Sequence, residues 1–578
     1  MIESRDTQLA AASRETDLST AMATRLRKLL RRWLVRDGIV LAIFFALALL
    51  TIAPIVPAMG SRIIGGRGDN VQHIYMTGWM ARALLLGQSP FYDPHLNYPD
   101  GLELVTTDVP YSSILVAAPL TWLSGPIFGY NAIIWLSALL SGYFAYLWVL
   151  SITDSRFGAW VAGAAFLLTP YRVGHSYGHL NLTATYALPL FFWALDHASR
   201  LGARSRQLLL LAGATFLVGS NSQYHLVICT VTGAVYALLA IHPRAWLHLG
   251  WRPAAGVLVG GVASALPYLW ASESRSFQAY DILATRFWSA DPLNFLLPSP
   301  LHPLWGALFE SLRPERLWLE KTLYVGAVAL VLAVAGLCWR RNPHRRQAMI
   351  WMGCALIGML FALGTDLHIN NQPLQPDAPF WLPAYYLSFL PGTDLMRVWA
   401  RFGIVTILFV ALLAGLAAGR IAAQRWHGHT AILAIIAALL IIDMLPGWPE
   451  TALLEPRPVE LWLARQPGDF AVAFLPAGLD NYGAMFGSLF HGKYLPGFTH
   501  PQHLPRAFRE FVQRASTFPK PSSIAALRQS GLRYLLVDRK QFNGKRLPPW
   551  SEIQRALSAM PGIKMLEQYG DFVVVELT

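Results

Sequence analysis

Residues 25–57 read RLRKLLRRWLVRDGIVLAIFFALALLTIAPIVP, a basic segment followed directly by an uninterrupted apolar run. The apolar part, 38–57, is long enough to cross a hydrocarbon core of about 30 Å as a helix. Lys and Arg ahead of a first span favour a cytoplasmic N-terminus. The stretch therefore predicts a signal anchor behind a basic cytoplasmic tail, 1–37. A cleaved signal peptide fits less well, because the run is long for one and many more apolar runs follow.

The composition of the whole chain is that of a membrane protein. Of its 578 residues, 54% are hydrophobic and only 14% are charged, whereas about a quarter are charged in soluble domains. The net charge of +13 comes from Lys and Arg in short loops between apolar runs, which argues against a nucleic-acid partner. Cys229, Cys338 and Cys354 lie in apolar segments and are too few and scattered for a disulfide framework or a zinc site.

Eleven apolar runs are predicted to span the membrane. A further run, 112–123, is short and contains Pro119. If it stays on the outer surface, every short basic loop is cytoplasmic, whereas a crossing would move the later loops outside, against the positive-inside rule. We therefore predict an all-α polytopic membrane protein. The eleven runs are 38–57, 129–151, 157–170, 183–198, 207–220, 224–241, 254–271, 322–338, 348–364, 402–424 and 430–446.

This topology places long segments on the side away from the cytoplasm. Within a transmembrane domain, 38–446, these outer loops are 58–128, 272–321 and 365–401. The polar region 447–578 follows them on the same side. Its runs 470–475, 534–537 and 572–577 have the pattern of strands, and 522–530 and 551–560 have that of helices. The sequence thus predicts a small extracytoplasmic α/β domain, and we expect the function on this side.

Acidic candidates lie in the first outer loop. Asp69, in Gly65-Gly66-Arg67-Gly68-Asp69-Asn70, comes just after the first span and ahead of an interfacial helix, 71–86, which carries His73. Asp100, in Tyr98-Pro99-Asp100-Gly101, and Asp108, in Thr107-Asp108-Val109-Pro110, also fit ordinary turns, in which Asp beside Pro or Gly is common.

Cationic candidates lie where other spans reach the outer side. Arg172, His175 and His179 belong to the loop 171–181, for which holding two span ends is an equal alternative to ligand contact. If that loop is helical, the two histidines share a face and suit a metal. Arg397 and Arg401 precede the tenth span beside Trp399 and Phe402, where the alternative is snorkelling to the interface. Glu320 and Lys321 are expected to pair with each other.

The order of these features resembles the GT-C glycosyltransferases, the superfamily of protein O-mannosyltransferases and aminoarabinose transferases, and more closely the bacterial GT-C-like membrane proteins. The resemblance covers about 40–450 as architecture, and its specific motifs are few. The matching residues are Gly68-Asp69, Tyr98-Pro99-Asp100-Gly101, Phe128-Gly129-Tyr130-Asn131, Thr169-Pro170-Tyr171-Arg172, Tyr324-Val325-Gly326 and Arg397-Val398-Trp399-Ala400-Arg401-Phe402.

The resemblance implies a bacterial plasma-membrane enzyme that transfers a hexosyl or pentosyl group from a polyprenyl-phosphate donor to a glycan, lipid or protein acceptor. Asp69 would be the base that activates the acceptor hydroxyl, with inversion. Cations of the outer loops would hold the lipid phosphate. The expected substrate-binding residues are Arg172, His175, His179, Arg397, Arg401, His73, Asp100 and Asp108. The chain lacks the paired Asp-x-Asp or Asp-Asp of many members, so no cofactor is certain and a divalent metal stays an open alternative.

Two other functions fit a chain of this kind. A transporter or flippase for a lipid-linked glycan also needs many spans and outer basic groups. It predicts polar residues at mid-bilayer and often internal repeats, whereas Asp196 and Asp443 lie near span ends. A non-catalytic membrane scaffold that presents the C-terminal domain is the second alternative, and the large outer loops make it less economical.

Overall fold

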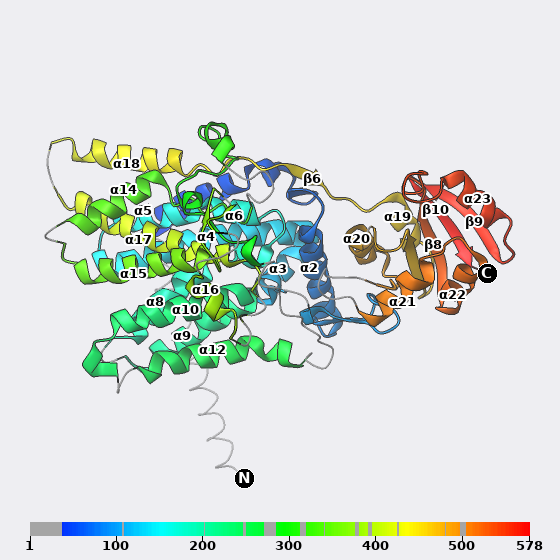
Figure 1. Cartoon of the computed structure of the whole chain (residues 1–578), viewed down its shortest axis with the longest axis horizontal. Helices are drawn as coiled ribbons and strands as arrows, with labels where there is room; N and C mark the ends of the chain where they lie inside the picture. The colour runs from blue at the N-terminus through cyan, green and yellow to red at the C-terminus, as the bar shows by residue number, and fades with distance from the viewer. Residues whose placement is uncertain are drawn as a thin grey trace, which may run out of the picture.

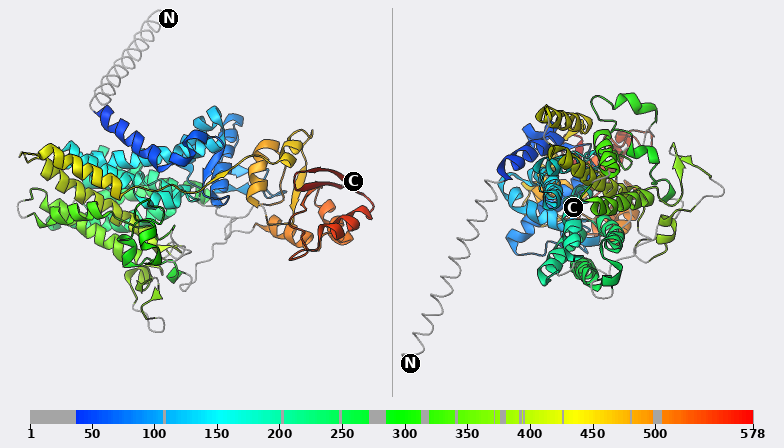
Figure 2. Two further views of the ribbon diagram at one scale, coloured as in Figure 1. Left: turned by 90° about the horizontal axis from the view of Figure 1, so that it is seen from above. Right: turned by 90° about the vertical axis from the view of Figure 1, so that its left-hand side faces the viewer.

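The computed structural model describes residues 37–577 except 107–108, 201–202, 247–249, 271–284, 313–318, 340–341, 371, 376–380, 391–392, 394–395, 425–426, 480 and 498–504. The predicted tail up to residue 36 and Asp108 lie outside the described residues. A bundle of long helices forms one part of the molecule, and a smaller mixed α/β part lies beyond one end of it (Figure 1; Figure 2, left).

Each of the eleven predicted apolar runs contains a helix. By length and composition, three helical segments can cross a membrane: Pro126–Thr153, Gln223–Ala240 and Trp399–Ala422. The number of spans therefore stays a prediction. The bundle helices are Asp37–Thr51, α4 (Pro126–Thr153), α5 (Arg156–Leu167), α8 (Ala187–Ala198), α9 (Ser205–Asn221), α10 (Gln223–Ala240), α12 (Trp251–Trp270), α14 (Ala327–Cys338), α15 (Arg345–Ala362), α17 (Gly403–Ala422) and α18 (His429–Asp443).

Helix α17 lies at the centre of the bundle, because small residues let its neighbours approach closely. Its side chains are buried from Gly403 to Gly419, and it packs against α5, α14 and α15. A Cβ added at Gly158 of α5 would lie 2.7 Å from the Cα of Gly419. Without a hydrophobic driving force between helices in lipid, such close backbone packing is what holds them together.

Two helices of the first outer loop, α2 (Asp69–Leu86) and α3 (Tyr111–Ser124), lie at the end of the bundle that faces the C-terminal part (Figure 1). At the start of α3, the Ser113 hydroxyl donates to Asn221 of α9 over 2.6 Å. At its other end, the Trp122 indole donates to the Ala81 carbonyl of α2 over 2.9 Å. Because α2 also lies at this end, both ends of α3 contact the same end of the bundle. This geometry favours the prediction that 112–123 does not cross.

The C-terminal part contains a four-stranded mixed sheet of order β7-β8-β10-β9. β7 (Ala471–Leu475) is parallel to β8 (Leu532–Asp538), while β10 (Phe572–Leu577) is antiparallel to both β8 and β9 (Ile563–Tyr569). The predicted strands and the two predicted helices are confirmed. The helices of this part are α19 (Pro458–Ala464), α20 (Asn481–His491), α21 (Arg506–Ala515), α22 (Pro521–Gln529) and α23 (Trp550–Ser558).

Short elements connect these parts and shape the outer end. A two-stranded sheet of β1 (Arg62–Ile64) and β6 (Thr451–Leu453) joins the start of the first outer loop to the segment that leads into the C-terminal part. The other short elements are η1 (Ala53–Ala58), β2 (Tyr92–Asp93), β3 (Leu102–Glu103), η2 (Leu104–Thr106), α6 (Pro170–His175), α7 (Leu180–Thr183), η3 (Pro243–Ala245), η5 (Pro292–Phe295), η6 (Ala307–Leu312), β4 (His368–Ile369), β5 (Gln372–Pro373), α16 (Pro383–Leu387) and η7 (Trp399–Phe402).

Candidate active site

Asp69 is the first residue of α2, and the loop before it is held in place by hydrogen bonds. The buried Asn70 side chain donates to the carbonyls of Ile64 and Gly66 over 3.0 and 2.8 Å and accepts from the Gly68 amide over 3.0 Å. Gly65 has a φ of 76°, and a Cβ there would lie 2.6 Å from the Tyr177 ring. A glycine is therefore needed at this position to bring the loop against the segment 174–179.

The Asp69 side chain is exposed and meets residues from two other parts of the chain. A Cβ added at Gly178 would lie 3.3 Å from the Asp69 Cβ, so the loop between α6 and α7 passes directly beside the carboxylate. From the C-terminal part, the Tyr482 hydroxyl of α20 donates a hydrogen bond to the Asp69 carboxylate. Burial, together with this acid, raises the pKa of Tyr482. Asp69 thus lies where the bundle, the first outer loop and the C-terminal part meet.

A buried charged cluster lies next to Asp69. The Nδ1 atoms of His175 and His179 are 3.2 Å apart, and His175 Nε2 is 3.8 Å from a carboxylate oxygen of Glu320. Arg401 Nε and Nη2 donate to the two oxygens of Glu320 over 3.0 and 2.6 Å. The Arg401 guanidinium also lies over the Tyr224 ring, 4.3 Å from its centroid. The predicted pairing of Glu320 with Lys321 is therefore wrong, since Glu320 binds Arg401 in the fork geometry that arginine favours.

The charges of this cluster act on one another. Burial lowers the pKa of His179, Glu320 and Asp69 act to raise it, and Arg401 and Arg397 add to the lowering. For Glu320, burial alone would raise the pKa of the carboxyl, but Arg401 and His175 hold it well below its ordinary value. Arg401 thus lowers the pKa of both His179 and Glu320. One electrostatic environment therefore includes His179, Glu320, Asp69 and the two arginines.

His175, His179 and Glu320 also have the donor types of a divalent-metal site. Each offers one ligand atom, and these atoms lie within 4.8 Å of one another. Two imidazoles and a carboxylate suit zinc. Glu320, however, already accepts from Arg401 with both of its oxygens, and a guanidinium beside a dication is unfavourable. The set fits a metal in donor type and spacing but not in charge, so we assign the cluster no metal.

The remaining cationic candidates differ in their surroundings. Arg397 is half-buried, and its guanidinium lies 5.0 Å from the centroid of the Trp288 ring. Arg172 is 2% exposed. Its side chain donates to Thr185 Oγ1 and to the carbonyls of Phe166 and Leu167, which end α5. These contacts favour the alternative in which Arg172 holds two span ends, and we leave it out of the candidate site.

The remaining candidates of the first outer loop are Asp100, His73 and Asp108. Asp100 is exposed in a turn, where its amide donates to the Asn97 carbonyl over 3.0 Å, as the turn alternative predicts. His73 is buried on α2, one helical turn after Asp69 and on the same face. Asp108 lies outside the described residues. Among the described candidates, the structure therefore brings together Asp69, His175, His179, Arg401 and Arg397.

Sequence reasoning missed three residues of this site. Glu320 was seen but assigned to its sequence neighbour, although its partner Arg401 is 81 positions away. Tyr482 lies in α20, a helix that was not predicted. Asn70 carried a usable signal, because an Asn directly after Gly-Asp at a helix start is suited to bonding the preceding loop.

Several solved structures resemble the chain over most of its length. Arabinofuranosyltransferase AftD from Mycobacteria gives a TM-score of 0.51 at 17% identity, over 95% of this chain and 41% of AftD. ArnT from Cupriavidus metallidurans, solved with undecaprenyl phosphate bound, gives 0.49 at 13% identity, over 94% of this chain and 98% of ArnT. An Archaeoglobus fulgidus oligosaccharyltransferase gives a TM-score of 0.46 at 11% identity, over 88% of this chain and 70% of the oligosaccharyltransferase. No curated protein matches the chain.

The likeness to AftD confirms the resemblance to GT-C glycosyltransferases at the level of the fold. The chain spans less than half the length of AftD, so the activity of that protein is not transferred with the fold. In sequence, the family described as a domain of unknown function, DUF6311, matches residues 39–445, which is most of the chain and runs from within the first helix of the bundle to beyond the end of α18. The protein belongs to the DUF6311 family.

Proposed function

We propose that this protein is an integral membrane glycosyltransferase that transfers a sugar from a polyprenyl-phosphate donor to an extracytoplasmic acceptor. The observation that carries the proposal is an exposed carboxylate, Asp69, beside the cluster of Arg401, Glu320, His175 and His179 and near Arg397, at one end of the bundle. A donor with a prenyl tail cannot leave the bilayer, so its phosphate must react at the interface, where this cluster is expected to lie. The GT-C fold supports the same reaction class, but only as analogy.

In the proposed reaction, Asp69 accepts the proton of the acceptor hydroxyl. The oxygen attacks the anomeric carbon while the bond from that carbon to the phosphate oxygen breaks, and the polyprenyl phosphate leaves with the bonding electrons. The result is inversion without a covalent intermediate. The leaving phosphate gains negative charge, which fixed cations stabilise. Arg397 is the primary candidate for this contact, because its side chain is half-buried, whereas Arg401 is 5% exposed and donates to both oxygens of Glu320.

Asp69→Asn tests the proposal directly, because the amide keeps the shape of the side chain but cannot accept the proton. Loss of a general base lowers the rate by about 10² to 10⁴. We expect this loss in single-turnover transfer from a polyprenyl-phosphate sugar, measured on the purified chain in nanodiscs. Asp100→Asn is the matched control, since it changes an exposed acid of the same loop. Activity of Asp69→Asn near that of Asp100→Asn would exclude Asp69 as the base.

A further inference from the structure

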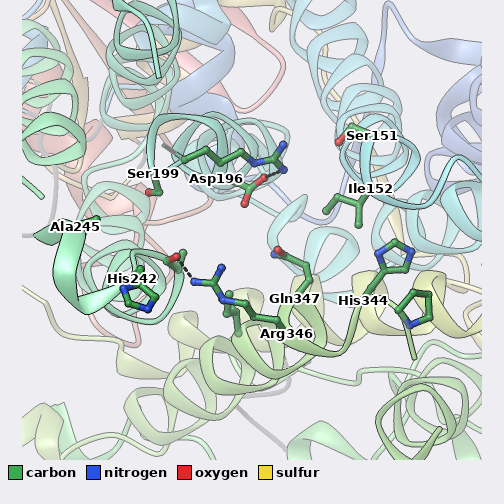
Figure 3. A pocket seen from close by; sticks show the side chains of 13 residues that line it. Ser151, Ile152, Asp196, Ser199, His242, Ala245, His344, Arg346 and Gln347 are labelled. Carbon is green, nitrogen blue, oxygen red and sulfur yellow. Dashed lines mark hydrogen bonds and ion pairs between the residues drawn. The ribbon is translucent and has the colours of Figure 1, made fainter. Parts of the chain in front are cut away.

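A second polar site lies at the other end of the bundle, away from Asp69. A cavity of about 490 Å³ is lined by the ends of α4, α8 and α10, by η3 and by the start of α15. Figure 3 shows side chains of these elements around a common space. The polar side chains that line the cavity are Ser151, Asp196, Ser199, Arg200, His242, His344, Arg346 and Gln347.

Positive charge predominates in this cavity. Its one acid, Asp196, is buried and already matched, since it accepts from the Tyr236 hydroxyl over 2.8 Å and from Arg200. The Gln347 amide donates to the Tyr236 hydroxyl over 2.9 Å and so fixes this network. Arg346 donates to the Ala240 carbonyl at the end of α10. This carbonyl does not neutralise the guanidinium, and among the described residues no carboxylate forms an ion pair with Arg346. The cavity therefore carries a net positive charge even when both histidines are neutral.

One buried hydroxyl also points to a ligand. Ser199 is 6% exposed and lines the cavity, and within the described part of the chain its Oγ has no hydrogen-bond partner. A buried polar atom without a partner is costly, so such atoms usually meet water or a ligand. An acceptor oxygen in the cavity would satisfy this hydroxyl.

We infer that this cavity binds a phosphate group. Arginine in a fork geometry, a serine hydroxyl and an amide nitrogen are the donors that phosphate oxygens favour. The phosphate would be free or would belong to an anionic lipid headgroup. Leu239 and Met349 are 45% and 48% exposed and adjoin the lining residues Ala240 and Ile350. An apolar surface thus begins where the cavity ends, as acyl chains attached to that phosphate would require.

The test uses the full chain with two probes, inorganic phosphate and phosphatidic acid. Affinity for phosphate is measured by calorimetry in detergent, and lipid retention by native mass spectrometry against phosphatidylcholine. Arg346→Gln should weaken binding by about tenfold or more, because a charge-assisted hydrogen bond is lost. The loss of affinity in Ser199→Ala should be several-fold smaller than that in Arg346→Gln. Arg345→Gln is the matched control, because Arg345 is the exposed neighbour of Arg346 outside the cavity lining. It should bind like wild type.

The outcomes separate the sources of the phosphate. Retained phosphatidic acid that inorganic phosphate displaces identifies a headgroup site, and binding of inorganic phosphate alone identifies an ion site. If Arg346 only caps α10, Arg346→Gln lowers the unfolding temperature while binding stays as in Arg345→Gln, and the inference is overturned. It is equally overturned if neither probe binds the wild-type chain. Neither result bears on Asp69, which lies at the opposite end.

Discussion

The Arg401–Glu320 ion pair is the residue contact on which the cluster beside Asp69 depends. Arg401 is 5% and Glu320 6% exposed. Removal of one partner of such a pair leaves a buried charge uncompensated, which costs about 3–5 kcal/mol. We expect Arg401→Ala to lower the thermal unfolding midpoint in nanodiscs, and the double variant Arg401→Met with Glu320→Leu to recover most of the loss. An unchanged midpoint in Arg401→Ala would show that the pair does not form.

Arg397 is expected to contact the donor phosphate rather than to hold the fold. Arg397→Ala removes a cation whose contact with a phosphate is a charge-assisted hydrogen bond, so the donor KM should rise about tenfold or more. The acceptor KM should stay within about twofold of wild type. Arg397→Lys should rescue only in part, because lysine lacks the planar fork.

Steady-state transfer with varied donor decides between this role and snorkelling. If Arg397 only reaches for the interface, lysine restores the donor KM fully, since either long cation can do so. Arg244→Ala, at the basic opposite end of the bundle, is the control for a general effect of lost charge and should leave the donor KM unchanged. An unchanged donor KM in Arg397→Ala would remove this residue from the site.

At the scale of elements, α20 covers the candidate base. A Cβ added at Gly78 of α2 would lie 2.8 Å from Leu489, so the two helices pack closely. The Tyr482 hydroxyl donates to Oδ1 of Asp69, where it would compete with the acceptor hydroxyl of the proposed reaction. Tyr482→Phe keeps the ring but removes this competitor, so we expect the acceptor KM to fall about three- to tenfold with the donor KM unchanged.

The control for Tyr482→Phe is Tyr569→Phe, which removes an exposed hydroxyl bonded to Glu567 in the same part of the chain. Its kinetics should match wild type. A lower kcat in Tyr482→Phe, with the acceptor KM unchanged, would mean that Tyr482 orients Asp69 for catalysis instead of competing for it.

The elements that the sequence predicted well are those with a strong apolar signal. A long apolar run predicts a helix without knowledge of its partners, whether the protein buries its side chains, as in α17, or leaves most of them unburied, as in α18, where Leu440 and Asp443 are buried. β9 and α20 were missed for the opposite reason. β9 is an edge strand in which no residue is buried and Lys564, Glu567 and Gln568 are exposed, and α20 is short and defined by its packing on α2.

The candidate site was predictable only in part, because its contacts join distant positions. Asp69 and the histidines stand out by their place in the chain, and the structure brings them together. The partner of Arg401 could not be found from the sequence, because 81 residues separate it from Glu320. No periodicity spans such a distance. Arg172 shows a second limit of the sequence, since a cation at a span end looks alike whether it binds a ligand or caps a helix.

For the whole molecule, the two ends of the bundle predict its orientation in the membrane. Asp69, the cluster beside it and the C-terminal part lie at one end, whereas the arginines of the phosphate cavity lie at the other. Basic loops favour the cytoplasm, so the cavity should face inward and the C-terminal sheet outward.

Alkaline phosphatase fused after residue 578 should be active, because it folds only outside the cytoplasm, and green fluorescent protein fused there should stay dark. The same reporters fused after residue 204 should give the reverse pattern and serve as the control. A fluorescent C-terminal fusion would require an even number of crossings before residue 447 in place of the predicted eleven, and a crossing by α3 or one failed span would supply it. Because both ends of α3 contact α2 or α9 at the same end of the bundle, the failed span would then be sought among the shorter apolar helices, α14 and α18 first.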